Sequence, residues 1–452
     1  MRKFNYIFMS VMALLLLACG GENVSDPAFD SDEMPYIYME WAGTLTYHEG
    51  DTIRMNAEVS PLSDTDCRWM ADGNVISTAD TLFYVVGNKD FTLRFEAERN
   101  GKTNFRTALV TVIKDFKAKE YKHIVTGVIT GGITADQIQW DCITHLQYSQ
   151  LTVDKTTGEL TLPDAKELNA LKTIVTLAHN NGVYVFIDVA GPTAYPNGAG
   201  TYNESSFNTV ATDPALRAIL IKNLKEFVEK YQLDGVNITM NNLNNDAGAL
   251  ADHDGLTAFF NDLADAFPAE RVAPFNHFFL TASVPMAWND YEFYFLGNAK
   301  RLDWVNFNLY GATDLSPVPS APDWQIADHV TRFSTAAGIP SSKMVVGIAA
   351  YGVKYDIPAG VSPTWGTLDG MLSYPTWSEI LAMDSGAGAK SMLNVNSGLF
   401  YTGLTGADNS VAGKAALVRQ NAVAGMFLWT INYDTSNAAT SLLRAIHHEM
   451  NE

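Results

Sequence analysis

The pattern of hydrophobic and polar positions divides the chain into two parts. Between residues 36 and 115, short segments rich in β-branched and aromatic residues are separated by turn signals such as Asp72-Gly73 and Asn100-Gly101. In Thr52–Val59 every second residue is apolar, which is typical of a half-buried strand. We therefore expect a small all-β sandwich over residues 36–115. Its expected strands are Tyr36–Glu40, Thr52–Val59, Thr81–Val86, Phe91–Ala97 and Phe105–Ile113.

From about residue 120 to the end, apolar strand-like segments alternate with helical ones. The clearest helix begins at Asp213-Pro214, a cap followed by proline at the first helical position, and continues with an apolar stripe from Leu216 to Val228. Eight strands alternating with helices over 120–452 predict an α/β fold, a (β/α)8 TIM barrel. The expected strands are Ile124–Ile129, Ile143–Tyr148, Val183–Val189, Gly235–Met240, Phe279–Val284, Trp304–Leu309, Met344–Ile348 and Gly425–Trp429.

The first 18 residues have the organisation of a bacterial lipoprotein signal peptide. Arg2-Lys3 precedes an apolar run over 8–17, which is too short to span a bilayer as a helix. The sequence Leu-Leu-Ala-Cys that ends at Cys19 resembles a lipobox, in which the cysteine becomes the lipidated N-terminus. Residues 19–35 are small, polar and acidic, as in a flexible tether. We expect a secreted protein anchored to the outer membrane through Cys19, at the cell surface.

Charge and cysteine content narrow the classes of partner. The formal net charge of −20 argues against a nucleic-acid partner, because phosphate backbones attract Lys and Arg, whereas a neutral glycan is compatible with it. No spacing of Cys or His indicates a metal site, and no motif indicates a cofactor.

Cys67 and Cys142 fall in different expected domains. Two separate buried thiols are favoured for them, with a disulfide in an oxidising compartment as the alternative.

The fourth expected barrel strand carries the most specific motif. The segment FVEKYQLDGVNITMNN resembles the signature of family-18 glycoside hydrolases, the chitinases and endo-β-N-acetylglucosaminidases, whose pattern is Asp-Gly-x-Asp-x-Asp-x-Glu. Residues two apart on a strand share a face, so the family's acidic residues form one column facing the lumen. Asp234 and Gly235 match this pattern, but the column reads Asn237, Thr239 and Asn241. The resemblance therefore implies a barrel without its catalytic acid, and general acid catalysis contributes about 10²–10⁴-fold.

Other segments follow the same family pattern in order. The strand VYVFIDVAG occupies the place of the family's Ser-x-Gly-Gly, with Asp188 and Ala190 as departures. The strand ending at Tyr310 resembles Met-x-Tyr-Asp, with Gly311 in place of the Asp, and Trp429 ends the eighth strand. The resemblance implies that Trp429 forms the floor under a sugar and that Tyr310 bonds its acetamido group. Stacking on an indole needs no titratable group, so binding can outlast catalysis.

The ligand-contact set that we expect is Trp429, Tyr310, Asn241, Thr239 and Asp188. For each, a purely structural role inside the barrel is the alternative, and Asp234, at the start of its strand, is expected to be structural. Asp188 is a new carboxylate that either faces the ligand or is a satisfied buried group.

The favoured function is a catalytically inactive surface lipoprotein that binds N-acetylglucosamine-containing glycans of N-glycan or chitin type for uptake, with an outer-membrane glycan transporter as its expected partner. Two alternatives stay open. One is an active chitinase or endo-β-N-acetylglucosaminidase that uses a displaced acid such as Asp188 or Asp246, and the other is a structural or adhesive surface protein with a vestigial cleft. The sandwich domain, which resembles immunoglobulin-like or PKD-like modules, is interpreted as a spacer, with glycan binding as a minor alternative.

Overall fold

The computed structural model describes residues 34–39, 43–190, 206–240, 252–271, 277–286, 290–310, 313–393, 398–406 and 408–452. The chain divides between Ile113 and Lys114 into an N-terminal and a C-terminal unit, each with its own core. Within the described ranges, no helix combines the length and the hydrophobicity that crossing a membrane requires.

The N-terminal unit is all-β, as the alternating pattern predicts. A five-stranded sheet in the order β2-β9-β8-β5-β6 is accompanied by the two-stranded sheets β1-β4 and β3-β7. Their apolar faces share one core, in which Trp69 and Phe95 are fully buried with ring centroids 4.8 Å apart. The strands are β1 Tyr36–Tyr38, β2 Thr44–His48, β3 Thr52–Asn56, β4 Glu58–Ser60, β5 Asp66–Ala71, β6 Asn74–Ser77, β7 Thr81–Val85, β8 Phe91–Arg99 and β9 Lys102–Ile113.

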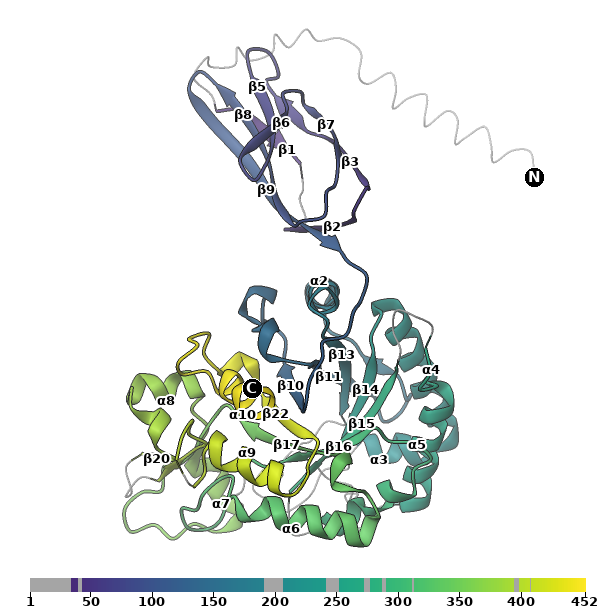
Figure 1. Ribbon diagram of the computed structural model, residues 1–452, viewed down its shortest axis with the longest axis vertical. Coiled ribbons are helices and arrows are strands. Elements are labelled where there is room, and N and C mark those ends of the chain that lie inside the picture. Colours follow the sequence, from purple (N-terminus) through teal and green to yellow (C-terminus); the bar gives the residue numbers. More distant parts are fainter. Residues whose placement is uncertain are drawn as a thin grey trace, which may run out of the picture. The chain divides into compact units, whose positions relative to one another are not determined.

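The C-terminal unit is an eight-stranded parallel barrel, which confirms the expected fold class. Neighbouring strands pair in the order β10-β22-β17-β16-β15-β14-β13-β11, and pairing of β10 with β11 closes the ring (Figure 1). The short β12 (Leu160–Thr161) adds to β11 in antiparallel fashion. The barrel strands are β10 Ile124–Ile129, β11 His145–Val153, β13 Tyr184–Ala190, β14 Gly235–Thr239, β15 Phe279–Pro285, β16 Trp304–Asn308, β17 Met344–Ala349 and β22 Gly425–Trp429.

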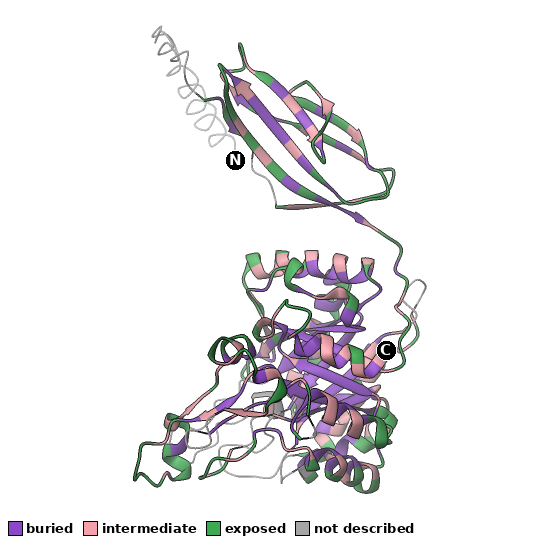
Figure 2. Cartoon of the chain, turned by 60° about the vertical axis from the view of Figure 1, so that its left-hand side comes forward, coloured by how far each residue is buried: buried purple, intermediate pink, exposed green. Residues whose placement is uncertain are grey.

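Helices cover the outside of these strands, with their apolar faces turned inward, so that the strands are the most buried part of the unit (Figure 2). In α4 the Asp213 side chain accepts hydrogen bonds from the Ala215 and Leu216 amides at 2.8 and 3.2 Å, and Pro214 opens the helix as expected. The helices are α2 Ala165–Asn180, α3 Ser206–Thr212, α4 Pro214–Tyr231, α5 His253–Ala266, α6 Trp324–Arg332, α7 Trp365–Leu368, α8 Trp377–Met383, α9 Val411–Gln420 and α10 Leu442–Asn451.

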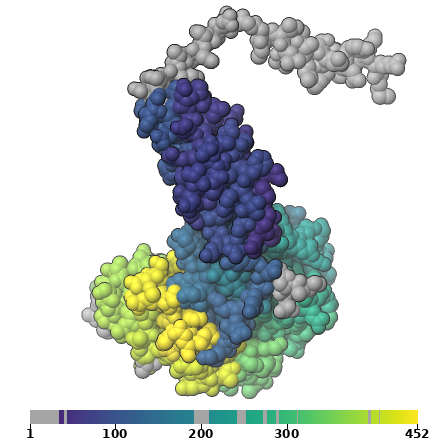
Figure 3. Space-filling model, turned by 45° about the horizontal axis from the view of Figure 1, so that its top comes forward, coloured from purple at the N-terminus to yellow at the C-terminus, as the bar shows by residue number. Residues whose placement is uncertain are grey.

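The first barrel strand is held by the last helix. Asn451 at the end of α10 accepts hydrogen bonds on Oδ1 from the Lys122 and His123 amides, both at 2.9 Å. The yellow C-terminal segment accordingly lies against the blue segment that opens the barrel (Figure 3). The ring is therefore closed by strand pairing and also by side-chain capping of its first strand.

An insertion follows β17 that the hydrophobic pattern did not predict. It forms a small antiparallel sheet in the order β19-β18-β21-β20, together with α7 and α8. Its strands are very short, and such segments carry no readable period. They are β18 Val353–Tyr355, β19 Leu372–Ser373, β20 Met392–Leu393 and β21 Leu399–Phe400.

The two described cysteines are separate buried thiols. Cys67 lies in the N-terminal unit and Cys142 in the barrel unit, and both are free. The favoured interpretation of these residues agrees with the structure.

Candidate functional site

The bottom of the barrel lumen is filled by aromatic rings. The His145 imidazole lies 5.2 Å from the Trp304 ring and 5.5 Å from the Phe186 ring, measured between centroids. Tyr184 and Phe279 complete this layer. Burial lowers the pKa of His145 to about 3, so the ring is neutral at physiological pH. This layer is a packed floor beneath the site.

Above this floor, polar side chains from neighbouring strands converge on Asp188. Its Oδ1 accepts hydrogen bonds from Thr239 Oγ1 at 2.7 Å and from Asn237 Nδ2 at 2.8 Å. Its Oδ2 accepts one from Ser149 Oγ at 2.9 Å. Strands β13 and β14 align Asp188 with Asn237, which brings these groups to one level of the lumen. The sequence predicted Asn237, Thr239 and Asn241 as one column, with Asp188 on the preceding strand, and the structure joins Asn237, Thr239 and Asp188 in one network.

Asp188 has no exposed surface, and burial raises the pKa of its carboxyl group. Hydrogen bonds from Thr239, Asn237, Ser149 and Gln147 act in the opposite direction, because each favours the charged form. An acceptor with this many donors is a satisfied buried carboxylate. Of the two interpretations left open by the sequence, the geometry favours the satisfied buried group.

The network continues across the next two strands through Asn237. Asn237 Oδ1 accepts hydrogen bonds from Thr281 Oγ1 at 2.7 Å and from Asn306 Nδ2 at 3.1 Å. Asn306 Oδ1 in turn accepts from the Trp304 indole at 2.9 Å, which joins the polar layer to the aromatic floor. Asn237 is fully buried and therefore acts as the centre of a lumen network, whereas Thr239 is half-buried and lies nearer the open end.

At the rim, two aromatic side chains from opposite parts of the chain come together. The Tyr310 and Trp429 rings are nearly parallel, with an interplanar angle of 19° and centroids 6.3 Å apart. Trp429 ends β22 and Tyr310 follows β16, so both stand at the carboxyl ends of strands, where barrel enzymes place their sites. Both rings are only partly buried.

Asn241 and Asp234 are the other two motif residues of the fourth strand segment. Asn241 lies outside the described residues, so its expected position beside Trp429 is not placed. Asp234 lies at the opposite end of the strand, where its carboxylate accepts from the Val185 amide at 2.8 Å and contacts His179 and Arg271 at 2.8 and 2.9 Å. These contacts agree with the structural role expected for it.

One polar residue of the site was missed by the sequence reasoning. Asn308 lies two positions before Tyr310 and two after Asn306, on the lumen face of β16. It is buried, and its Oδ1 has no hydrogen-bond partner among the described residues. The alternation Trp304, Asn306, Asn308, Tyr310 was the available signal. A buried acceptor without a partner is a natural contact for a ligand that donates a hydrogen bond.

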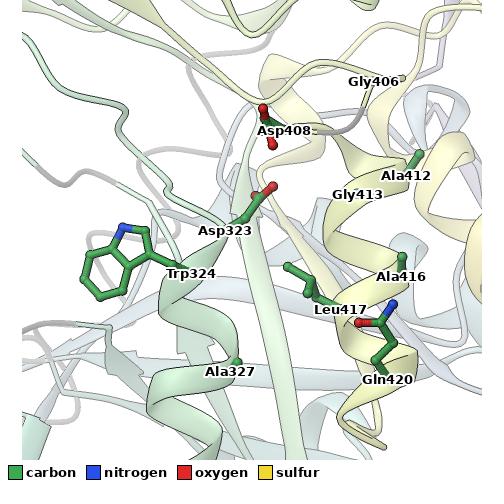
Figure 4. A pocket seen from close by; sticks show the side chains of 10 residues that line it. All are labelled: Asp323, Trp324, Ala327, Gly406, Asp408, Ala412, Gly413, Ala416, Leu417 and Gln420. Atoms are coloured by element: carbon green, nitrogen blue, oxygen red, sulfur yellow. The ribbon is translucent and has the colours of Figure 1, made fainter.

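Away from this site, a cavity of about 600 Å³ lies on the outer wall between α6 and α9 (Figure 4). Asp323 and Asp408 line one end of it, and Trp324 points away from α9. Asp323 forms an ion pair with the buried Lys414 and accepts a hydrogen bond from the Asn409 amide at 2.9 Å. These contacts give Asp323 a structural role. Across the part of the chain that is described, no group of three or more His, Cys, Asp or Glu side chains is arranged to hold a metal ion.

Comparison with known proteins identifies the barrel. The model of the glycosyl hydrolases family 18 matches residues 118–434, and the chain belongs to this family. Among curated relatives, a "chitinase-like effector" of Moniliophthora perniciosa is 26% identical over 290 residues, 57% of this chain and 61% of the relative. The chain thus spans about three fifths of that relative's length. "Nod factor hydrolase protein 1" of Medicago truncatula is 24% identical over 337 residues, 66% of this chain and 83% of the relative.

Solved structures agree on the fold. A chitinase from Bacteroides thetaiotaomicron superposes with a TM-score of 0.55 at 21% identity, covering 73% of this chain and 96% of the other. A class V chitinase from Nicotiana tobaccum superposes with a TM-score of 0.57 at 18% identity, covering 72% and 98%. At this level of identity the structures establish the barrel fold, and the function has to be argued from the site.

Proposed function

We propose that this protein is a glycan-binding member of family 18 that holds N-acetylglucosamine-containing glycans without hydrolysing them. The observation that carries the proposal is the composition of the motif strand: amide and hydroxyl groups, Asn237 and Thr239, stand where the family has carboxylates. The nearby carboxylate, Asp188, is fully buried and fully hydrogen-bonded. A group in this position cannot reach a glycosidic oxygen to protonate it.

The binding half of the site supports the same proposal. The Trp429 indole and the Tyr310 ring stand together at the open end of the barrel. A pyranose face can stack on an indole through apolar burial alone, with no proton transfer. Thr239 on β14 and the buried Asn308 on β16 add polar groups to the lumen. This combination of aromatic surface and a few fixed polar groups is typical of a ligand site.

The rival function is hydrolysis by a displaced acid. Asp188 is disfavoured for this role by its burial and its hydrogen bonds, and Asp246 lies outside the described residues. The names of the relatives include both a hydrolase and a chitinase-like effector, so they are compatible with active and inactive members. They make chitooligosaccharides the first ligands to test. The third alternative, an adhesive protein with a vestigial cleft, predicts neither binding nor turnover.

The cellular setting is part of the proposal. Lipidation of Cys19 would hold the barrel at the cell surface, and the N-terminal unit, as an immunoglobulin-like or PKD-like spacer, would extend it from the membrane. A glycan captured there would pass to an outer-membrane transporter. The Leu-Leu-Ala-Cys sequence and the acidic segment that follows it support the anchor.

A binding screen paired with digestion tests the proposal. Purified wild-type protein and a Trp429→Ala variant are titrated calorimetrically with chitooligosaccharides and N-glycans, and each ligand that binds is then incubated overnight and analysed for cleavage. Binding that depends on Trp429 without any cleavage supports the proposal. Robust wild-type turnover that survives Asn241→Ala would establish another acid and overturn it, and absence of all binding would favour the vestigial cleft.

A further inference from the structure

One end of the N-terminal unit presents apolar side chains to solvent. Met34, Tyr36 and Tyr38 occupy every second position of the segment that contains β1, and the residues between them are buried, so the three share one outward face. Their exposed fractions are 55%, 55% and 57%, and Leu62, just after β4, is 53% exposed. The antiparallel register places Tyr36 opposite Ser60, so the chain at Met34 and the chain at Leu62 run toward the same end of the unit. We call Met34, Tyr36, Tyr38 and Leu62 the end patch.

The end patch lies where the chain enters the unit. Asn104 Nδ2 donates to the Pro35 carbonyl at 3.0 Å, close to the tip of the β8–β9 hairpin. The chain leaves the unit after Ile113, about 30 Å away along β9 at the usual rise of a strand. Residues 20–33, which follow Cys19, span at most about 50 Å when fully extended. The end patch is therefore on the anchor side of the unit and within reach of a membrane that holds Cys19.

The strand that carries the two tyrosines is fixed to the rest of the unit. The Arg106 guanidinium donates to the Ile37 carbonyl at 3.1 Å, and the Ile37 side chain is buried in the core. The Tyr36 and Tyr38 rings lie 4.5 Å apart, measured between centroids. Side chains on a backbone held in this way lose little conformational freedom when they bind a surface.

The chemistry of the end patch fits the interface of a lipid bilayer. Tyrosine combines an apolar ring with a polar hydroxyl group and is enriched where lipid tails meet head groups. Glu58 on β4, opposite Tyr38, is an exposed carboxylate, so head groups without net negative charge fit best. Four partly exposed side chains are too few to hold a protein on a membrane alone, since even a single acyl chain binds reversibly. The contact therefore depends on an anchor.

We infer that the end patch docks on the lipid bilayer to which Cys19 anchors the chain. This inference rests on the proposed anchoring and is independent of the proposed glycan binding. The anchor keeps the end patch close to the bilayer, so a weak contact is enough to occupy it. Docking orients the unit with Ile113, where the chain continues to the barrel, away from the lipid.

Fluorescence quenching on vesicles tests the inference. The lipidated full chain is reconstituted into phosphatidylcholine vesicles with brominated acyl chains, which quench a fluorophore on contact, and unbrominated vesicles give the reference. An environment-sensitive fluorophore is attached through Leu62→Cys or, as the control, Val85→Cys, since Cys67 and Cys142 are buried thiols. We expect the label at position 62 to be quenched and its emission shifted to the blue, and the label at position 85 to show neither change.

Val85 is the matched control because it is exposed at the opposite end of the same unit. It lies on β7 and is 64% exposed. Its neighbour Val86 exchanges backbone hydrogen bonds with residues 50–51, which follow His48, and His48 pairs with Ile113. A bilayer contact confined to the end patch leaves this position in water.

A second set of variants tests the two rings directly. Tyr36→Ser combined with Tyr38→Ser should remove most of the quenching at position 62, because both rings leave the contact. Phe83→Ser is its control, since Phe83 is a 68% exposed ring on β7 outside the end patch, and it should leave the quenching in place.

The outcomes separate docking from anchoring. Lipidated protein with no quenching at position 62 overturns the docking and leaves the anchor and the glycan binding standing. Equal quenching at positions 62 and 85 also overturns it, because the unit would then lie along the membrane. A blue shift at position 62 that brominated lipid does not quench would indicate a second copy of the chain in place of the bilayer and overturn it as well. If the purified chain carries no lipid at Cys19, the anchor and the docking both fail.

Discussion

Thr239 donates a 2.7 Å hydrogen bond to Asp188 across the neighbouring strands β14 and β13. In the family pattern the carboxylates belong to the strand of Thr239, and the strand of Asp188 carries Ser-x-Gly-Gly. This chain has a carboxylate on β13 and a hydroxyl and an amide on β14, with the donors and the acceptor exchanged between the strands. Among the described residues of β13 and β14, the acidic group that faces the lumen is Asp188, which has no exposed surface.

The first prediction concerns the Trp429 indole at the rim of the barrel. Trp429→Ala should weaken glycan binding by about 1–3 kcal/mol, because it removes the indole on which the sugar stacks and exposes the Tyr310 ring. Trp429→Phe keeps an aromatic ring and should lose less. Calorimetry with one ligand across the three proteins measures the difference. Equal affinities for the wild type and Trp429→Ala would contradict stacking of the sugar on the indole.

A second prediction separates ligand binding from stability at two asparagines of β16. Asn308→Leu should change the free energy of unfolding by less than about 1 kcal/mol and reduce glycan affinity, because the Oδ1 of Asn308 has no partner among the described residues. Asn306→Leu is the control. It breaks bonds to Asn237 and Trp304 and should cost about 1–3 kcal/mol of stability. Urea unfolding of both variants measures the change in stability, and calorimetry measures the change in glycan affinity. A stability loss in Asn308→Leu that equals that of Asn306→Leu, with affinity unchanged, would make Asn308 structural.

The acid sensitivity of the fold should depend on His145. Its pKa is about 3 in the folded protein and about 6.5 when unfolded. Below about pH 6.5 the unfolded chain therefore binds a proton that the folded protein does not, and the free energy of unfolding falls as pH is lowered toward 3. His145→Leu should flatten this dependence relative to the wild type in urea unfolding between pH 7 and pH 5.

His448 provides a control with the opposite sign. Its hydrogen bond and charge interaction with Glu452 raise the pKa of this exposed imidazole, so its stabilising contribution is present at low pH and is lost as pH rises. His448→Leu should therefore leave the acid sensitivity of the fold in place. If His145→Leu and the wild type show parallel pH profiles, burial of a neutral His145 is not the cause.

The sequence pattern predicted the barrel well because its strands are nearly continuous apolar runs. Ile124–Ile129 and Gly425–Trp429 coincide with β10 and β22, since buried parallel strands are apolar on both faces. In the N-terminal unit β2, β5 and β6 were not predicted. In β5 the buried Cys67, Trp69 and Ala71 do alternate with more exposed residues, but charged residues interrupt the run.

The sequence predicted site residues on individual strands, but not the hydrogen bonds between strands. The motif identified Asn237 and Thr239 as a lumen column, but their bonds to Asp188 depend on the register between β13 and β14, which neither strand specifies alone. The ring contacts of Tyr351 with Tyr310 and of Tyr374 with Tyr351 were not predicted, because the insertion that carries Tyr351 and Tyr374 has strands of two or three residues. Residues that come together only through tertiary contacts produce no periodic hydrophobic pattern in the local sequence.

Anchoring is the fourth prediction. Cys19→Ala should move the protein from the membrane fraction to the soluble fraction, because lipidation needs the thiol of that residue. Cys67→Ala is the matched control, since Cys67 is a buried thiol in the N-terminal unit and should leave fractionation unchanged. Membrane association that persists in Cys19→Ala would contradict the lipoprotein interpretation.

The final prediction tests the exchange of donors and acceptor between β13 and β14. Thr239→Asp alone replaces a donor to Asp188 with a second carboxylate about as close as the present 2.7 Å contact. Two carboxylates at that distance cannot both be ionised, so the variant should lose more than about 2 kcal/mol of stability at pH 7 and recover part of it near pH 4, where one proton is shared. Asp188→Ser restores the residue that the family pattern has on β13. Combined with Thr239→Asp, it should recover about 1–3 kcal/mol beyond additivity in a double-mutant cycle of urea unfolding. Restoring the acidic motif of the family should depend on position 188 in the same way. Asn237→Asp, Thr239→Asp and Asn241→Glu together should fold stably only when Asp188→Ser accompanies them. Strict additivity of Thr239→Asp and Asp188→Ser would show that the two positions do not compensate each other, and the exchange would then be incidental.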